Sequence, residues 1–220
     1  MIKCCVFDLD GTILDTISTI TYYVNKALQK FGYGEISEDS CKYFVGNGAR
    51  ALIKRALSHL GVTDAQITER VFLYYDGEYK SSPYYLTDRF SGMAELLSAL
   101  RARGIKLAVV SNKQDAITRE AVSHFYPDVF DAVVGGREGV PLKPAPDAPL
   151  SLISELGFLP SEVAFIGDTS VDVETGINMK AGLVIGVTWG LREADELVRA
   201  DAIVHSPDEI LSAIDEKNKK

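Results

Sequence analysis

Polar side chains that could do chemistry together occur in four short clusters of this sequence. The clusters read Asp8-Leu9-Asp10-Gly11-Thr12, Ser111-Asn112-Lys113, Leu142-Lys143-Pro144 and Gly167-Asp168-Thr169-Ser170-Val171-Asp172. Carboxylates that are crowded into one site repel one another and need a cation or shared protons. Because these clusters supply Asp, Ser and Thr rather than a Cys or His cluster, they favour a hard cation, with Mg²⁺ the first expectation.

Such a site would suit phosphoryl transfer. A Mg²⁺ ion with few protein ligands keeps positions open for water and a phosphate oxygen. Lys143 and the donors on Ser111 and Asn112 would then hold the remaining phosphate charge. In phosphoryl transfer, positioning and neutralisation of charge supply most of the catalysis. An aspartate in such a site can also accept the phosphoryl group covalently.

The elements that would bring the clusters together follow an α/β pattern. Apolar runs alternate with amphipathic stretches of helical spacing, and the runs cover residues 2–9, 105–111, 132–135, 163–167, 183–188 and 202–205. This alternation predicts a Rossmann-like, mostly parallel sheet with helices on both faces. In such sheets ligands bind beyond the carboxyl ends of the strands, so the clusters should converge at one edge.

One region breaks the alternation. From residue 16 to residue 82 the sequence has helical periodicity and no convincing strand. An all-helical block of this length is too long for a crossover connection, so we expect a second small domain over 16–82. The α/β domain would then comprise 1–15 and 83–220, with hinges after Asp15 and at Ser81-Ser82-Pro83.

Composition narrows the classes of partner. The chain has 220 residues and a net charge of −8, whereas nucleic-acid binders usually present a basic face. No apolar run approaches the ~20 residues that span a bilayer, and Asp8 interrupts the apolar start where a signal peptide would continue. Cys4 and Cys5 fit a buried strand and Cys41 has no spaced partner, which fits a reducing compartment. We expect a cytoplasmic monomer or weak dimer with no nucleic-acid or membrane partner.

In this order, the four clusters resemble the four motifs of phosphatases of the haloacid dehalogenase superfamily. The matching positions are Asp8-x-Asp10-Gly11-Thr12, Ser111-Asn112, Lys143-Pro144 and Gly167-Asp168-x-x-x-Asp172. The helical block resembles the small cap that these enzymes carry between the first and second motifs. The resemblance implies a Mg²⁺-dependent phosphomonoester hydrolase that acts on a small phosphorylated metabolite through an aspartyl-phosphate.

The resemblance also implies roles for individual residues. Asp8 would be the nucleophile, and Lys143 would neutralise the transition state. Asp10 would protonate the leaving alcohol and then deprotonate the attacking water, which requires a proton on Asp10 at the start. The implied metal ligands are Asp8, the backbone carbonyl of Asp10 and Asp168, with Asp172 behind them. The implied phosphate-binding residues are Thr12, Ser111 and Asn112.

Single residues separate the branches of the superfamily. Dehalogenases resemble this pattern but lack the second aspartate, because halide needs no proton to leave, so Asp10 argues against them. Sugar-phosphate mutases commonly carry a different residue in place of Thr12, which favours hydrolysis. The segment Val45-Gly46-Asn47-Gly48-Ala49-Arg50 resembles the cap loop of phosphoglycolate phosphatases. Gly46 and Arg50 are therefore candidate substrate residues, although Arg50 also fits a surface ion pair.

Several alternatives stay open from the sequence. Pyrophosphatases and nucleotide phosphatases of the superfamily have similar cap loops, and a sugar-phosphate mutase is a further alternative. A response-regulator-like receiver would carry its phosphorylated aspartate on a middle strand and would lack the helical insertion. A regulatory binding protein on the same fold would be expected to lack a catalytic position, and none is missing here.

Overall fold

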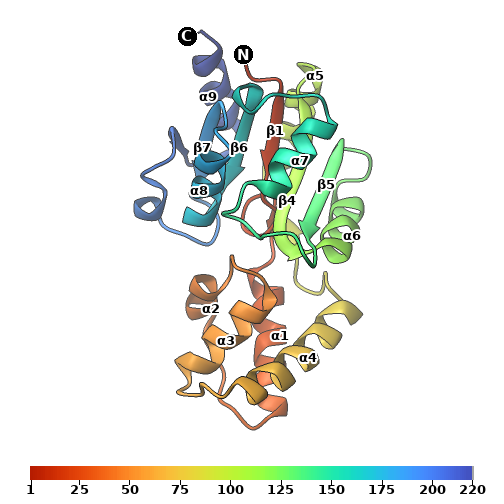
Figure 1. Cartoon of the computed structure of the whole chain (residues 1–220), viewed down its shortest axis with the longest axis vertical. Coiled ribbons are helices and arrows are strands. Elements are labelled where there is room, and N and C mark those ends of the chain that lie inside the picture. Colours follow the sequence, from red (N-terminus) through yellow and green to blue (C-terminus); the bar gives the residue numbers. More distant parts are fainter. Residues whose placement is uncertain (220) are drawn as a thin grey trace. The chain divides into compact units, whose positions relative to one another are not determined.

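The computed structural model describes residues 1–219, and its contacts divide the chain into two compact units (Figure 1). Unit 1 contains Met1–Asp15 and the chain from Arg89 onward, and unit 2 contains Thr16–Asp88. Unit 1 holds a parallel sheet with flanking helices, whereas unit 2 is built from helices.

A six-stranded parallel sheet forms the centre of unit 1. In spatial order its strands are β5 (Ala132–Gly136), β4 (Lys106–Gln114), β1 (Cys4–Phe7), β6 (Val163–Gly167), β7 (Leu183–Val187) and β8 (Ala202–Val204). The chain extends the sheet from β1 first toward β5 and then toward β8, so the direction of growth reverses beside β1. Ligand sites of open α/β sheets lie at such a reversal.

Helices cover both faces of this sheet. Right-handed crossovers place α5 (Met93–Ala102) and α6 (Asp115–Phe125) on one face, and α7 (Asp147–Glu155) and α8 (Ser170–Asn178) on the other. The last two lie in front of the sheet in Figure 1. The terminal helix α9 (Pro207–Lys219) packs against α5. Because both faces are covered, every residue of β1, β6 and β7 is buried.

The predicted fold class is confirmed. Each apolar run predicted for the α/β domain overlaps one of the six strands, with β4 and β5 extending beyond the ends of their runs, and the pairs between neighbouring strands are parallel. The short helices η1 (Pro160–Glu162) and η2 (Ala194–Leu197) lie in the connections around β6 and β7.

Unit 2 consists of α1 (Ile17–Lys30), α2 (Glu38–Phe44), α3 (Ala49–His59) and α4 (Ala65–Ser81). Side-chain caps begin two of them: Ser37 accepts a hydrogen bond from the amide of Ser40, and Asp64 accepts one from the amide of Ile67. The apolar faces of the four helices share a buried core that includes Val24, Leu28, Ile53, Leu57 and Val71.

The chain returns to unit 1 later than the sequence predicts. We placed the return at residue 83, whereas the contacts of the structure assign residues 83–88 to unit 2. The reason is local: the amide of Leu86 donates to the hydroxyl of Thr19 at 3.1 Å, and the hydroxyl of Thr87 lies 2.8 Å from the same oxygen. The short strands β2 (Leu14–Asp15) and β3 (Asp88–Arg89) pair where the chain passes between the units.

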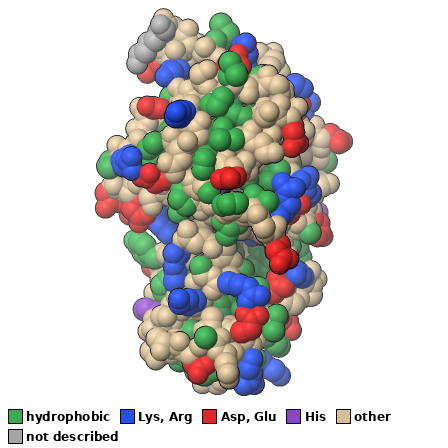
Figure 2. Space-filling model, in the orientation of Figure 1, with side chains coloured by type: hydrophobic (Ala, Val, Ile, Leu, Met, Phe, Trp, Pro, Cys, Tyr) green, Lys and Arg blue, Asp and Glu red, His purple; other side chains and the backbone are tan. Residues whose placement is uncertain are grey.

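The surface of the described residues carries charges of both signs. Figure 2 shows Lys and Arg side chains mixed with Asp and Glu over the visible face, without a large patch of one sign. Among residues 1–219, none of the helices combines the length and apolar character that a membrane crossing requires.

The packing of α5 on the sheet gives a stability prediction. Leu97 is 1 % exposed, so Leu97→Ala should lower the free energy of unfolding by about 2–5 kcal/mol, because it removes buried methyl groups and leaves a cavity. Urea denaturation followed by circular dichroism measures the change. Leu159→Ala is the matched control, because Leu159 is 65 % exposed and surface substitutions usually change stability by less than ~0.5 kcal/mol. Similar losses in both variants would contradict this packing.

Candidate active site

The turn that follows β1 carries Asp8, Asp10 and Thr12. The carbonyl of Leu9 accepts hydrogen bonds from the amides of Thr12, Ile13 and Leu14, which closes the turn directly after the strand. Gly11 adopts φ +84°, and a Cβ atom there would lie 2.3 Å from Oδ2 of Asp168. Both the backbone angle and the close approach of Asp168 therefore require glycine at this position.

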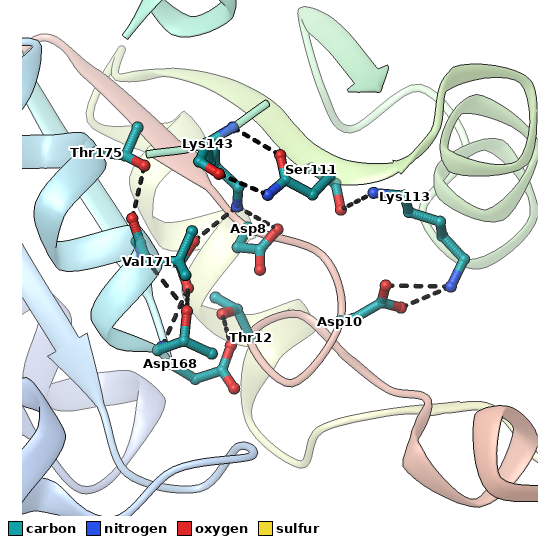
Figure 3. Close-up of polar contacts among 12 residues, drawn as sticks. Asp8, Asp10, Thr12, Ser111, Lys113, Lys143, Asp168, Val171 and Thr175 are labelled. Carbon is teal, nitrogen blue, oxygen red and sulfur yellow. Dashed lines mark hydrogen bonds and ion pairs between the residues drawn. The ribbon is translucent and has the colours of Figure 1, made fainter. Parts of the chain in front are cut away.

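Lys143 lies between two carboxylates at the centre of the site. Its Nζ is 2.7 Å from Oδ1 of Asp8 and 2.6 Å from Oδ1 of Asp172, and the lysine is only 4 % exposed (Figure 3). Burial alone would lower the pKa of Lys143, but the charges of Asp172 and Asp8 outweigh it and hold the pKa above its ordinary value. The lysine therefore stays a cation inside the protein.

Three buried carboxylates form a group that could hold a metal ion. Asp8, Asp168 and Asp172 each offer an oxygen, and these oxygens all lie within 4.8 Å of one another. Burial, followed by the charge of Asp172, raises the pKa of Asp8 to about 7 and raises that of Asp168 well above its usual range. One lysine does not offset this much negative charge. An oxygen-only donor set with surplus negative charge fits a hard divalent cation.

Asp168 is held by hydrogen bonds to both of its oxygens. The hydroxyl of Thr12 donates to Oδ1 at 2.8 Å, and the amide of Leu191 donates to Oδ2 at 2.8 Å. The indole N–H of Trp189 donates to the carbonyl of Thr12 at 3.1 Å. We expected Thr12 to bind phosphate, whereas its hydroxyl contacts Asp168 here. No motif pointed to Leu191, because it contributes only its backbone.

Asp172 lies in the first turn of α8 and also contacts Lys143. The amide and hydroxyl of Thr169 donate to Oδ2 of Asp172 at 3.1 and 2.6 Å, which forms a capping box at the start of the helix. Its other oxygen is the one that contacts Lys143. Asp172 is thus one of the three neighbouring carboxylates, and its place behind the metal ligands stays a prediction.

The side-chain amide of Asn112 holds the backbone of Lys143. Its Nδ2 donates to the carbonyl of Lys143 at 3.0 Å, and its Oδ1 accepts from the amide of Lys143 at 2.8 Å. Both the donor and the acceptor of its buried side-chain amide take part in this contact, and the predicted role of Asn112 in phosphate binding stays a prediction. Ser111, the neighbouring candidate, is buried, and its hydroxyl accepts from the amide of Lys113 at 3.2 Å.

Asp10 contacts a second lysine that the motifs did not mark. Nζ of Lys113 lies 2.8 Å from Oδ1 and 3.1 Å from Oδ2 of Asp10. Figure 3 shows the carboxylate of Asp10 directed at Lys113 and away from Asp8 and Lys143. Lys113 therefore holds the Asp10 carboxylate in this structure, and the acid–base role implied for Asp10 stays a prediction.

The candidate substrate residues Gly46 and Arg50 belong to unit 2. Gly46 has φ +116° in the segment between α2 and α3, and Arg50 forms an ion pair with Glu69. The guanidinium of Arg50 also lies 4.0 Å from the ring centroid of Phe72, and its side chain is 62 % exposed. Arg55, which sequence reasoning missed, donates to the carbonyl of Phe44 and to Oδ1 of Asn47. Neither Gly46 nor Arg50 is part of the aspartate–lysine group of unit 1.

The fold and this group of residues define an α/β enzyme in which a buried aspartate contacts a buried lysine beside carboxylates suited to a cation. Residues 5–185 match the model of the haloacid dehalogenase-like hydrolase family, and the chain belongs to that family. The superfamily predicted from the motifs is therefore confirmed.

Similar proteins indicate which branch of the family this chain resembles. The chain is 28 % identical to the phosphoglycolate phosphatase of Aquifex aeolicus over 96 % of this chain and 95 % of that protein. It is 31 % identical to the phosphoglycolate phosphatase of Nitrosospira multiformis, with 93 % and 92 % covered. A crystal structure from Lactobacillus delbrueckii, provisionally named phosphoglycolate phosphatase, superposes with a TM-score of 0.91 at 30 % identity and covers 96 % of this chain and 98 % of its own. The chain is thus a phosphatase of the haloacid dehalogenase-like family.

The raised pKa of Asp8 makes stability depend on pH when no metal ion is bound. Its folded-state pKa of about 7 lies above the unfolded value of about 4, so its contribution to stability is present at low pH and is lost as pH rises from about 4 through 7. Asp8→Asn removes this titration. The metal-free variant should therefore melt at a higher temperature than the wild type at pH 8, and the difference should shrink toward pH 5.

Thermal unfolding in a chelating buffer at several pH values checks this prediction. Asp131→Asn is the control, and its stability should change in the opposite direction. Burial would raise the pKa of Asp131, but hydrogen bonds from Lys106 and from the amide of Leu107 outweigh it and lower the pKa. This variant should lose stability at pH 8. Parallel pH profiles for wild type and Asp8→Asn would contradict the assignment of a destabilising charge to Asp8.

Proposed function

We propose that the protein is a Mg²⁺-dependent phosphomonoester hydrolase that acts on a small phosphorylated metabolite, with 2-phosphoglycolate as the first candidate. The observation that carries the proposal is the contact of Asp8 with Lys143 inside a buried group of carboxylates. A carboxylate at this place could act as a nucleophile only if a cation offset the negative charge of the neighbouring carboxylates.

Mg²⁺ fits the residues of this group. Asp8, Asp168 and the backbone carbonyl of Asp10 would hold the ion, with Asp172 behind them. The raised pKa values of Asp8 and Asp168 support this choice, because they reflect burial first and then the negative charge of neighbouring carboxylates, which a bound cation would offset. When bound, Mg²⁺ supplies charge neutralisation for the phosphoryl oxygens.

The first half of the reaction would transfer the phosphoryl group to Asp8. A carboxylate oxygen of Asp8 forms a bond to phosphorus while the bond between phosphorus and the ester oxygen breaks. The leaving oxygen takes the proton of Asp10 and departs as an alcohol. Lys143 offsets charge on the transferred group, and we keep Ser111 as a hydroxyl donor to the phosphate.

The second half would release phosphate from Asp8. Asp10, ionised after the first half, takes a proton from water, and the water oxygen forms a bond to phosphorus. The bond between phosphorus and the Asp8 oxygen then breaks, so that Asp8 is again a free carboxylate. Each residue ends the cycle as it began, with one ester and one water consumed for one alcohol and one phosphate.

We propose that unit 2 is the cap domain and that it selects the substrate. The phosphoglycolate phosphatases among the relatives favour a phosphate ester that also carries a carboxylate. Gly46 would allow close backbone approach, and Arg50 would bind the substrate carboxylate. The pair of Arg50 with Glu69 is exposed, and exposed ion pairs contribute only about 0–1 kcal/mol, so a substrate carboxylate could replace Glu69.

We also propose that the protein works in the cytoplasm as a monomer or weak dimer. Its cysteines, Cys4, Cys5 and Cys41, are free and buried, and burial raises the pKa of each thiol. Such thiols are inert and fit a reducing compartment.

The covalent route predicts the effect of removing the nucleophile. Asp8→Asn should reduce hydrolysis of p-nitrophenyl phosphate at least ~10⁴-fold, because asparagine cannot form the acyl-phosphate bond. Chelation of Mg²⁺ should abolish the activity of the wild type, and added Mg²⁺ should restore it. Release of phosphate in the presence of Mg²⁺ measures both effects. Substantial activity in Asp8→Asn would exclude an aspartyl-phosphate on this residue.

The substrate proposal predicts a preference among phosphate esters. We expect kcat/KM for 2-phosphoglycolate to exceed that for pyrophosphate, sugar phosphates and nucleotides by at least about 10-fold. Arg50→Ala should raise KM for 2-phosphoglycolate about 10-fold more than KM for a neutral ester. Lys80→Ala, which removes an i,i+4 ion pair with Asp76 on the same unit, is the matched control. If Arg50→Ala raised KM equally for both substrates, Arg50 would have only a structural role in unit 2.

A further inference from the structure

Trp189 is the single tryptophan of the chain and lies in the loop that follows β7. It is half-buried, and neither half-reaction proposed above uses it. Its indole N–H donates to the carbonyl of Thr12 at 3.1 Å, and its ring packs edge-on against that of Phe90, with the ring centroids 6.5 Å apart. A buried indole N–H usually finds one defined acceptor. The hydrogen bond therefore attaches this loop to the turn that follows β1.

The loop of residues 188–191 and the turn after β1 fit closely at two glycines. A Cβ atom on Gly190 would lie 2.3 Å from the carbonyl oxygen of Gly11 and 2.5 Å from Cβ of Asp168. A Cβ atom on Gly11 would lie 2.8 Å from Cγ of Leu191. Neither position has room for a side chain, so the two backbones pack directly against each other. In packing of this density a displacement of the loop is transmitted to the turn.

The same loop and turn hold both oxygens of Asp168. The hydroxyl of Thr12 donates to Oδ1 (Figure 3), and the amide of Leu191 donates to Oδ2, each at 2.8 Å. Asp168 is 0 % exposed, so water does not stand in for either donor. A carboxylate oxygen can accept more than one bond, so both oxygens can still bind a cation. The two donors therefore set the orientation of the carboxylate.

We propose that Trp189 is a positioning residue that orients Asp168 for a divalent cation by fixing Thr12. The inference rests on the proposed function, in which Asp168 is a ligand of Mg²⁺. Trp189 touches neither the ion nor the substrate. Its N–H holds the backbone of Thr12, and the hydroxyl of Thr12 then reaches Asp168 from a fixed direction. Partners that orient a metal ligand typically change metal affinity about 10- to 100-fold when they are removed.

Binding of Mg²⁺ to the full-length protein tests the proposal without turnover. Isothermal titration calorimetry gives Kd, and the rise of the melting temperature with Mg²⁺ concentration gives it independently. Trp189→Phe keeps an aromatic ring but removes the N–H donor, so Kd for Mg²⁺ should rise about 5-fold, as expected for one lost hydrogen bond. The metal-free variant should melt no more than about 4 °C below the wild type. Saturating Mg²⁺ should restore phosphatase activity, which it would not do for a disturbed fold.

Two further variants identify the cause of the effect. Tyr23→Phe removes a hydrogen bond of the same kind in unit 2, from an aromatic side chain to the carbonyl of Ser82 at 2.9 Å, and should leave Kd for Mg²⁺ unchanged. Thr12→Val removes the hydroxyl that reaches Asp168. Because Trp189 acts through Thr12, Trp189→Phe should change Kd less than about 2-fold when it is added to Thr12→Val.

A measurement on the wild type keeps the proposal testable if Trp189→Phe does not fold. The single tryptophan gives one indole N–H signal in a nuclear magnetic resonance spectrum. If the hydrogen bond to Thr12 strengthens Mg²⁺ binding about 5-fold, bound Mg²⁺ must strengthen the hydrogen bond by the same factor, because the coupling is reciprocal. Saturating Mg²⁺ should therefore slow the exchange of the indole proton with water about 5-fold.

Three outcomes would overturn the role of Trp189: an unchanged Kd for Mg²⁺ in folded Trp189→Phe, a full effect of that substitution in the Thr12→Val background, or indole exchange that Mg²⁺ does not slow. Failure of the proposed function gives a different result. If the wild type binds no Mg²⁺, or if Asp168→Asn binds it as tightly as the wild type, the metal site itself is wrong, and the inference falls with it.

Discussion

The burial of a lysine between two aspartates is the interaction on which the site depends. Lys143 contacts Asp8 and Asp172 where almost no water reaches it. A buried ion pair is costly to form, and removing the lysine would leave uncompensated carboxylates. The surrounding structure supplies the necessary support: α8 fixes Asp172 through its first turn, and β1 fixes Asp8 at its end. The two segments lie more than 150 residues apart in the sequence, and adjacent parallel strands bring them together.

Much of this arrangement could be predicted from the sequence because it depends on where strands end. Asp8 and Asp168 each follow an apolar run, and parallel strands align their carboxyl ends whatever the details of the loops. The partners of individual polar groups could not be predicted in the same way. Thr12 and Asn112 belong to the motifs, yet one contacts Asp168 and the other contacts the backbone of Lys143. Those contacts depend on loop conformation, which residue spacing does not specify.

Two further features could not be predicted from residue patterns. The return to unit 1 was predicted too early, because Ser82-Pro83 looks like the end of a helical domain, whereas Thr19 holds the next residues against α1. Lys113 stands in one of the four clusters, but no role was predicted for it, because the matched motif ends at Asn112. Only the positions of Asp10 and the end of β4 relative to each other place it in a largely buried ion pair.

The side chain of Asn112 makes the kind of hydrogen bonds that a neighbouring strand would make. Its amide group offers one donor and one acceptor to the peptide of Lys143, the same pair of groups that a backbone unit offers across a sheet. The loop from β5 to α7 is thereby attached to β4 as well as to its own chain neighbours and to α8. An aspartate at position 112 would keep the acceptor for the Lys143 amide but lose the donor to the Lys143 carbonyl, so the lysine would lose one of the two hydrogen bonds that attach its backbone to β4.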